Sequence, residues 1–112
     1  MTTPPLEEAA IQTERRQGTR RKFRGSIEIE WGSAVLTGTV RDIGPRGLFV
    51  ELSPPLWVGA TFHARLNLNP VLLLDCTVVR VEPGTGIAVV FDVPEDSGKA
   101  QMEGLLVSLP AV

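Results

Sequence analysis

The 112-residue sequence has one cysteine, one histidine, no tyrosine and no apolar run approaching the length of a membrane helix. A single cysteine cannot form an internal disulfide, which is typical of proteins from a reducing compartment. A helix that crosses a membrane needs about 18–20 apolar residues. Residues 1–10 carry acids and two prolines where a signal peptide has a basic patch and an apolar stretch. We therefore expect a soluble, cytoplasmic protein without membrane insertion.

The sequence also lacks the patterns that carry catalysis or bind metals. It has no Gly-rich phosphate loop, no nucleophile elbow and no acid pair. His63 has no cysteine or carboxylate near it at metal-ligand spacing, so we interpret it as a surface residue of a strand. Cys76 lies in an apolar stretch and is predicted to be buried, and Trp31 and Trp57 are interpreted as packing residues. We expect a binding protein with no catalytic residue, metal or cofactor, not an enzyme.

Positive charge is concentrated near the N-terminus. Six of the eleven basic residues fall within ten positions: Arg15, Arg16, Arg20, Arg21, Lys22 and Arg24. From Gly25 onward, five basic residues face ten acidic ones. A nucleic-acid-binding protein usually spreads positive charge over the fold itself. The local cluster favours a small anionic ligand over a nucleic-acid polymer.

Most of the remaining chain has the pattern of short strands. Residues 27–31 alternate apolar with charged side chains, which is the period of a half-buried strand, and we expect order to begin at Ile27. Further strands are predicted at residues 34–41, 48–52, 61–68, 72–81 and 85–91. Six such strands favour an antiparallel sandwich or a closed barrel. Near the C-terminus the period becomes helical, with one face formed by Met102, Leu105, Leu106 and Leu109.

Two segments carry residues suited to binding an anion. Arg16 and Arg20 are four residues apart in a polar stretch, and a guanidinium can fork onto a phosphate or onto the edge of a guanine. The second segment runs from Asp42 to Gly47, a tight turn between two strands, where a carboxylate can accept hydrogen bonds from guanine and Gly47 permits close approach. Taken singly, a solvated tail accounts for the first segment equally well, and an ordinary turn is the favoured interpretation of the second. Arg41 and Arg46 flank the turn; they could contact a ligand, but surface charge is the favoured interpretation.

The two segments together resemble the PilZ family. That family pairs an N-terminal Arg-x-x-x-Arg arm with an Asp/Asn-x-Ser-x-x-Gly turn some twenty residues later. The resemblance covers about residues 14–109 and implies an all-β protein, a six-stranded antiparallel barrel with a C-terminal helix. It implies a bacterial second-messenger receptor that binds cyclic di-GMP and regulates an unidentified protein partner. The residues implied in ligand binding are Arg15, Arg16, Arg20, Asp42, Gly44 and Gly47.

The resemblance also sets the expected domain boundaries. Residues 1–13 are expected to form a flexible tail, and residues 14–112 a single PilZ-like domain. Within it we expect a flexible arginine arm at 14–24, the barrel at 26–92 and the helix at about 95–109.

Two departures from the family pattern leave alternatives open. Gly44 stands where the family prefers serine, and Arg20 with Arg24 forms a second Arg-x-x-x-Arg frame. We prefer the frame of Arg16 and Arg20, because the strand that starts at Ile27 then follows at the family's usual distance. The main alternative function is a PilZ-like adaptor that does not bind the nucleotide. A third alternative, an oligonucleotide-binding barrel, would need several exposed aromatic residues on one face. The sequence disfavours it, because it has no tyrosine and only six Phe and Trp residues.

Overall fold

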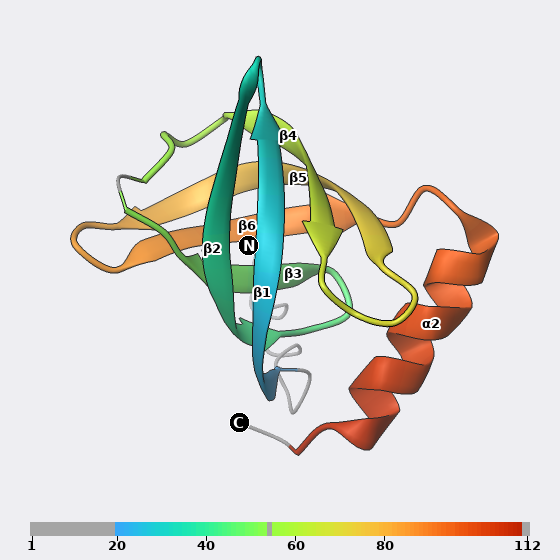
Figure 1. Cartoon of the computed structure of the whole chain (residues 1–112). Helices are drawn as coiled ribbons and strands as arrows, with labels where there is room; N and C mark the ends of the chain where they lie inside the picture. The colour runs from blue at the N-terminus through green and yellow to red at the C-terminus, as the bar shows by residue number, and fades with distance from the viewer. Residues whose placement is uncertain (1–19, 54, 111–112) are drawn as a thin grey trace, which may run out of the picture.

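The computed structural model describes residues 20–53 and 55–110, and it shows a closed antiparallel barrel with one helix beside it (Figure 1). Around the barrel the strand order is β1-β2-β3-β6-β5-β4, and pairing of β1 with β4 closes the ring. The all-β prediction is confirmed, and of the two arrangements left open by the strand pattern the chain forms the barrel. The elements are β1 (Arg21–Trp31), β2 (Ala34–Ile43), β3 (Gly47–Glu51), β4 (Thr61–Leu66), β5 (Leu72–Glu82), β6 (Gly86–Asp92) and α2 (Asp96–Ser108).

The barrel interior is built from the apolar residues of the alternating strands. Ile27 and Ile29 of β1 are fully buried, whereas Glu28 and Glu30, which alternate with them, point outward and accept hydrogen bonds from Arg65 of β4. Each buried aliphatic side chain stabilises the fold by about 1.5–3 kcal/mol relative to exposure. Fully buried residues from the other strands complete the core: Val40, Ile43, Leu48, Val50, Leu66 and Ile87.

The first strand begins earlier than the sequence predicts. The polar composition predicts a flexible arm through Arg24, but β1 already starts at Arg21, so that boundary is wrong. Arg21 and Lys22 pair with the end of β2, and exposure alternates along the segment as in a strand. Phe23 is partly buried against the core. Charged side chains on the outer face are compatible with a strand whose backbone is paired, and composition alone does not reveal that pairing.

The two halves of β1 differ in their pairing. Residues 27–30 are in register with β2 on one side and with β4 on the other. Residues 21–25 pair with β2 alone among the described strands, and their register shifts between Lys22 and Gly25. One further bond joins this half to the end of the described chain, where the Lys22 N–H donates to the Pro110 carbonyl at 3.1 Å. The first half is therefore held by fewer backbone bonds than the second.

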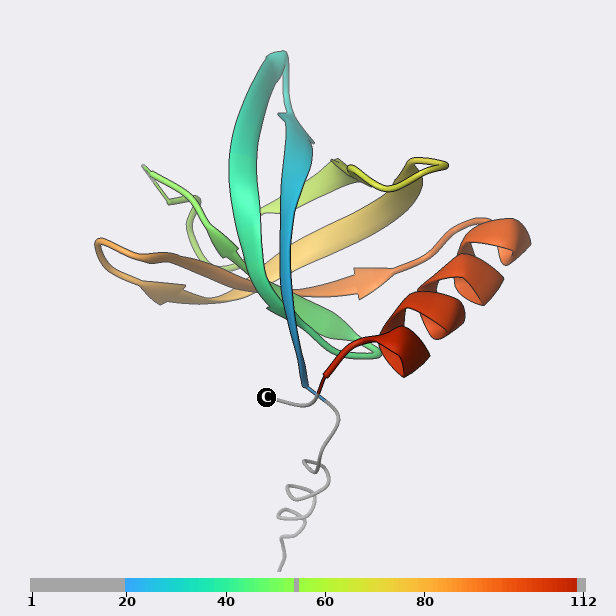
Figure 2. The same cartoon turned by 60° about the horizontal axis from the view of Figure 1, so that its bottom comes forward.

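The helix α2 lies beside the barrel near the loop between β4 and β5 (Figures 1 and 2). Its bounds agree with the expected helix at about 95–109. Met102 is buried in the core, and Leu105, Leu106 and Leu109 pack partly buried against it. The Gln101 side chain donates to the Pro70 carbonyl at 2.6 Å. Across residues 20–53 and 55–110, no helix is both long and apolar enough to cross a membrane.

Candidate functional site

The turn between β2 and β3 is fixed by backbone hydrogen bonds. The Gly44 N–H donates to the Gly47 carbonyl at 2.7 Å, which closes the turn on itself. The Phe91 N–H donates to the Arg46 carbonyl at 2.9 Å and joins the turn to β6. These bonds hold Asp42, which precedes the turn, in a defined position at the end of β2.

Gly47 allows β3 to approach β6 closely. A Cβ atom there would lie 2.7 Å from the Val89 carbonyl oxygen and 3.5 Å from a guanidinium nitrogen of Arg20. The first distance is too short for any side chain, so the glycine is required by packing. The backbone of β6 is the atom group that excludes a side chain here. Arg20 also lies beside this position, so Gly47 and Arg20 line the same hollow.

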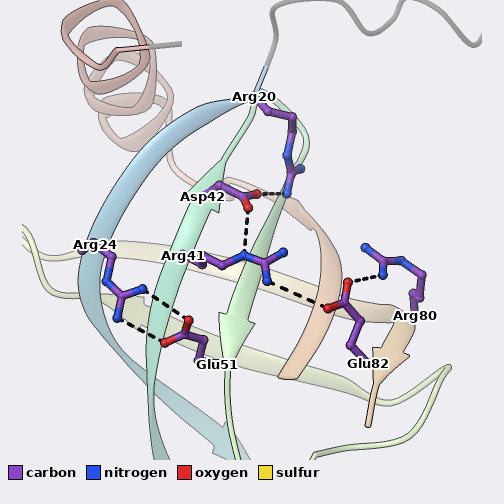
Figure 3. Close-up of polar contacts among 7 residues, drawn as sticks. All are labelled: Arg20, Arg24, Arg41, Asp42, Glu51, Arg80 and Glu82. Carbon is purple, nitrogen blue, oxygen red and sulfur yellow. Dashed lines mark hydrogen bonds and ion pairs between the residues drawn. The ribbon is translucent and has the colours of Figure 1, made fainter. Parts of the chain in front are cut away.

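The arm and the turn meet at an ion pair between Arg20 and Asp42, 22 residues apart in the chain (Figure 3). Asp42 also accepts a hydrogen bond from Nε of its neighbour Arg41, at 3.3 Å. The Asp42 side chain is 17% exposed and that of Arg20 is 43% exposed. The carboxylate is thus held between two guanidinium groups while remaining in reach of solvent.

Arg41 links this pair to a second carboxylate. Its guanidinium carbon lies 3.8 Å from the centre of the Phe49 ring, a cation–π contact. Its Nη1 lies 3.9 Å from a carboxylate oxygen of Glu82, which in turn accepts a hydrogen bond from Arg80 at 2.5 Å. Figure 3 shows the resulting row of alternating charges from Arg20 to Arg80 across the outside of the barrel.

A surface hollow of about 520 Å³ opens beside this row. Four arginines and one acid line it, so its charge is positive although the chain's net charge is −2. Val79 and Val90, which are 49% and 45% exposed, add an apolar part to the wall. The lining residues are Arg20, Arg41, Asp42, Arg46, Gly47, Leu48, Phe49, Val79, Arg80, Ala88, Val89 and Val90. This chemistry suits an anion that also carries flat, partly apolar groups.

Comparison with known families assigns the fold. The family model described as the PilZ domain matches residues 14–108, which include the arm, the turn, the barrel and the helix. The chain belongs to the PilZ family. The structure is also similar to the PilZ domain of CeSA from a cellulose-synthesizing bacterium. The TM-score is 0.62 at 18% identity, with 79% of this chain and 94% of that chain covered. No curated protein matches the sequence.

The PilZ arm is only partly within the described residues. Arg15 and Arg16 lie outside them, and Arg20, which both possible arginine frames share, lies at Asp42. Arg24 points elsewhere, because its guanidinium donates two hydrogen bonds, each of 3.2 Å, to the carboxylate of Glu51 (Figure 3). Arg24 does not line the hollow, so its position gives no support to the second frame.

Three further arginines belong to the candidate site of this PilZ domain, although none of them was assigned to it from the sequence. Arg41 and Arg46, interpreted as surface charge, both line the hollow, as does Arg80 from β5. Phe49 is 1% exposed although it lies outside the core cluster. Strand alternation could have placed Arg41 on the outer face. Its neighbours there come from β3 and β5, and one sequence does not reveal which strands adjoin.

The remaining residues singled out from the sequence lie away from the hollow of this PilZ domain. His63 is 78% exposed on β4 and bonds through Nδ1 to Asp75 at 2.7 Å, as expected for a surface position. Cys76 is buried, and desolvation together with the charge of Asp75 raises the pKa of its thiol from 9.0 to about 12. Trp31 and Trp57 pack edge to face with ring centroids 4.8 Å apart. Within the described chain, no cluster of three or more His, Cys, Asp or Glu side chains is arranged to hold a metal ion.

Proposed function

We propose that this PilZ domain binds cyclic di-GMP in the hollow beside Asp42 and acts as a second-messenger receptor that regulates a protein partner. The observation that supports this best is the ion pair between Arg20 and Asp42, which both line a positively charged hollow. The arm arginine and the turn carboxylate come from opposite ends of the sequence motif. A ligand that needs both a guanidinium and a carboxylate would find them together here.

The chemistry of the ligand matches these groups. An arginine can donate to the O6 and N7 atoms of guanine or to a phosphate oxygen. A carboxylate can accept from the N1–H and the exocyclic amine of the same base. The two phosphates of cyclic di-GMP would face Arg20, Arg46 and Arg80, which line the hollow.

Binding in this proposal exchanges partners. Asp42 is paired with Arg20 and Arg41, and pairs that remain partly open to solvent contribute little, on the order of 1 kcal/mol. Guanine would donate hydrogen bonds to the Asp42 carboxylate, and phosphate oxygens or base edges would accept hydrogen bonds from the guanidinium groups. Each charged group would therefore keep a partner. Arg15 and Arg16 would close over the ligand, and ordering that segment would reduce the net affinity.

A thermal unfolding series with cyclic di-GMP, together with calorimetric titration, tests the proposal. A ligand that binds only the folded chain at about 100 times its Kd adds roughly 2.7 kcal/mol to the free energy of unfolding. Cyclic di-AMP is the ligand control, because adenine lacks the O6 acceptor and presents a different edge to Asp42. Asp42→Asn is the matched protein control and should weaken cyclic di-GMP binding while the fold is kept.

A second candidate function is a protein-interaction adaptor on the same fold with no nucleotide. The observation that favours it is Gly44, which lacks the hydroxyl that the family turn usually presents. A folded protein whose melting temperature does not change at millimolar cyclic di-GMP would support this alternative and contradict the receptor proposal.

A further inference from the structure

The guanidinium group of Arg41 is held on three sides. Phe49 lies against one face, at 3.8 Å from the guanidinium carbon to the ring centre. Asp42 accepts from Nε at 3.3 Å, and Glu82 lies 3.9 Å from Nη1 at the other end. Figure 3 shows the two carboxylates at opposite ends of this side chain. An arginine in such a frame has already lost much of its rotational freedom.

One surface of this group remains available. The Arg41 side chain is 39% exposed and lines the hollow, while the ring below it is 1% exposed. Since the guanidinium lies over Phe49 on one face and both ends have carboxylate partners, the opposite face is the one left for a ligand to contact. This face is flat and cationic, and it stands over an aromatic ring.

We infer that Arg41 is a stacking platform for a purine base of the ligand, so that base, guanidinium and Phe49 form a three-layer stack. The inference rests on the proposed binding of cyclic di-GMP and adds a residue outside the arm and the Asp-x-Gly-x-x-Gly turn. Arginine stacks on aromatic planes more readily than lysine because its charge is delocalised over a planar, weakly hydrated group. The exposed Val79 and Val90 line the same hollow and offer apolar contact to the edges of the base or the sugar.

A simpler role for Arg41 would be to shield Phe49 from water and to hold Asp42 in place. That role needs the aliphatic stem and the charge, and lysine supplies both. A stacking role needs the plane, which lysine lacks. The two roles therefore differ in what a charge-conserving substitution does.

The test measures cyclic di-GMP affinity by calorimetry for wild type, Arg41→Lys, Arg41→Trp and Arg65→Lys. Arg65 is the matched control because it is also paired with two carboxylates, Glu28 and Glu30, but lies outside the hollow, and the change is identical. Stacking on one base is worth about 1–3 kcal/mol, or roughly 5- to 150-fold in Kd. Arg41→Lys should weaken binding at least about tenfold, and Arg65→Lys less than about threefold. Arg41→Trp should restore part of the loss, since it returns a flat surface without the charge.

Thermal unfolding without ligand verifies that each variant is folded. If wild type binds but Arg41→Lys binds within about threefold of it, or Arg41→Trp is as weak as Arg41→Lys, the stacking inference is wrong while the receptor proposal stands. If wild type itself does not bind cyclic di-GMP, both proposals are wrong.

Discussion

Arg20 and Arg24 lie four residues apart at the start of the chain's first strand, yet they have different partners. Arg20 pairs with Asp42 at the hollow, and Arg24 pairs with Glu51 outside it. The two residues carry the same charge, so any general attraction for an anion is removed equally when either is changed. The difference between their alanine variants thus isolates the direct contact with ligand.

Arg20→Ala should weaken cyclic di-GMP binding sharply, because a lost charge-assisted hydrogen bond costs about 1.5–3 kcal/mol. Arg24→Ala should change the Kd by much less, and neither variant should lower the apo melting temperature substantially, since exposed ion pairs contribute little. Arg16→Ala, outside the described residues, stays predicted to behave like Arg20→Ala. Calorimetry on the three variants checks this, and equal losses for Arg20→Ala and Arg24→Ala with a silent Arg16→Ala would support the second frame.

Gly44→Ser should tighten cyclic di-GMP binding by restoring the hydroxyl of the family turn. One net hydrogen bond is worth about 0.5–1.5 kcal/mol, which is roughly two- to twelvefold in Kd. The φ angle of Gly44 is compatible with serine, since the described glycines with positive φ are Gly32, Gly59 and Gly84. Gly44 is buried and does not itself line the hollow, so the test also measures whether a hydroxyl at this position reaches the ligand. Unchanged or weaker binding with unchanged stability would mean that position 44 does not face the ligand.

At the residue scale, the motif spacing in the sequence singles out Asp42 and Gly47, and the structure brings both to one hollow. Their role in ligand binding stays a prediction. Arg41 depends on Phe49 of β3 and Glu82 of β5. Those contacts arise from strand order around the barrel, which local pattern does not encode, and the same residue therefore reads from sequence as ordinary surface charge.

At the scale of elements, the helix α2 contains two glycines in contrasting surroundings. A Cβ at Gly98 would lie 2.8 Å from a methyl of Val93 and 3.0 Å from a methyl of Leu72. A Cβ at Gly104 would have no neighbour within 4 Å outside the helix itself. Glycine lowers helix propensity at both positions, but only the structure shows that Gly98 lets the helix approach the barrel.

Gly104→Ala should therefore raise the free energy of unfolding by about 0.5–1 kcal/mol through helix propensity and a less flexible unfolded chain. Gly98→Ala gains the same propensity but overpacks the contact with the barrel, which costs about 1–3 kcal/mol. Denaturant unfolding should rank Gly104→Ala above wild type and above Gly98→Ala. Equal stabilisation by both substitutions would show that α2 can shift away from the barrel at little cost.

Strand positions were predictable to within a few residues wherever apolar and polar side chains alternate. The boundaries of β4 follow that alternation, and those of β5 follow a mainly apolar run. Between the strands predicted at 72–81 and 85–91 lies a turn, in which the Thr85 N–H donates to the Glu82 carbonyl at 3.0 Å. The start of β1 was not predictable in this way. Its first residues are almost all basic, and they form a strand because β2 provides backbone partners.

At the scale of the whole molecule, the buried thiol of Cys76 makes the free energy of unfolding depend on pH in the alkaline range. The folded thiol keeps its proton up to a pKa of about 12, whereas the ordinary value is 9.0. Between these values the folded state binds more protons than the unfolded state, so the free energy of unfolding falls as pH rises. The sequence has no tyrosine and only two lysines to add to the titration in this range: Lys22 and Lys99.

We expect wild type to lose up to about 1.4 kcal/mol of stability per pH unit between roughly pH 9 and 12. Cys76→Ala should be less stable at neutral pH, because it leaves a small cavity, but its stability should decline less steeply above pH 9. Denaturant unfolding from pH 7 to 11 measures both slopes. Parallel slopes for the two proteins would contradict a thiol that stays protonated in the fold.

The unequal halves of β1 have a consequence for hydrogen exchange. Amides of residues 27–30 lie between two paired strands, so their exchange requires the barrel to open, whereas residues 21–25 can separate from β2 in a local opening. Exchange should therefore be faster in the first half than in the second. Because Arg20 directly precedes that first half, cyclic di-GMP should slow exchange mainly there. A ligand that slowed both halves equally would indicate global stabilisation, and a selective effect would identify the first half of β1 as a separate unit of local unfolding that carries the binding arm.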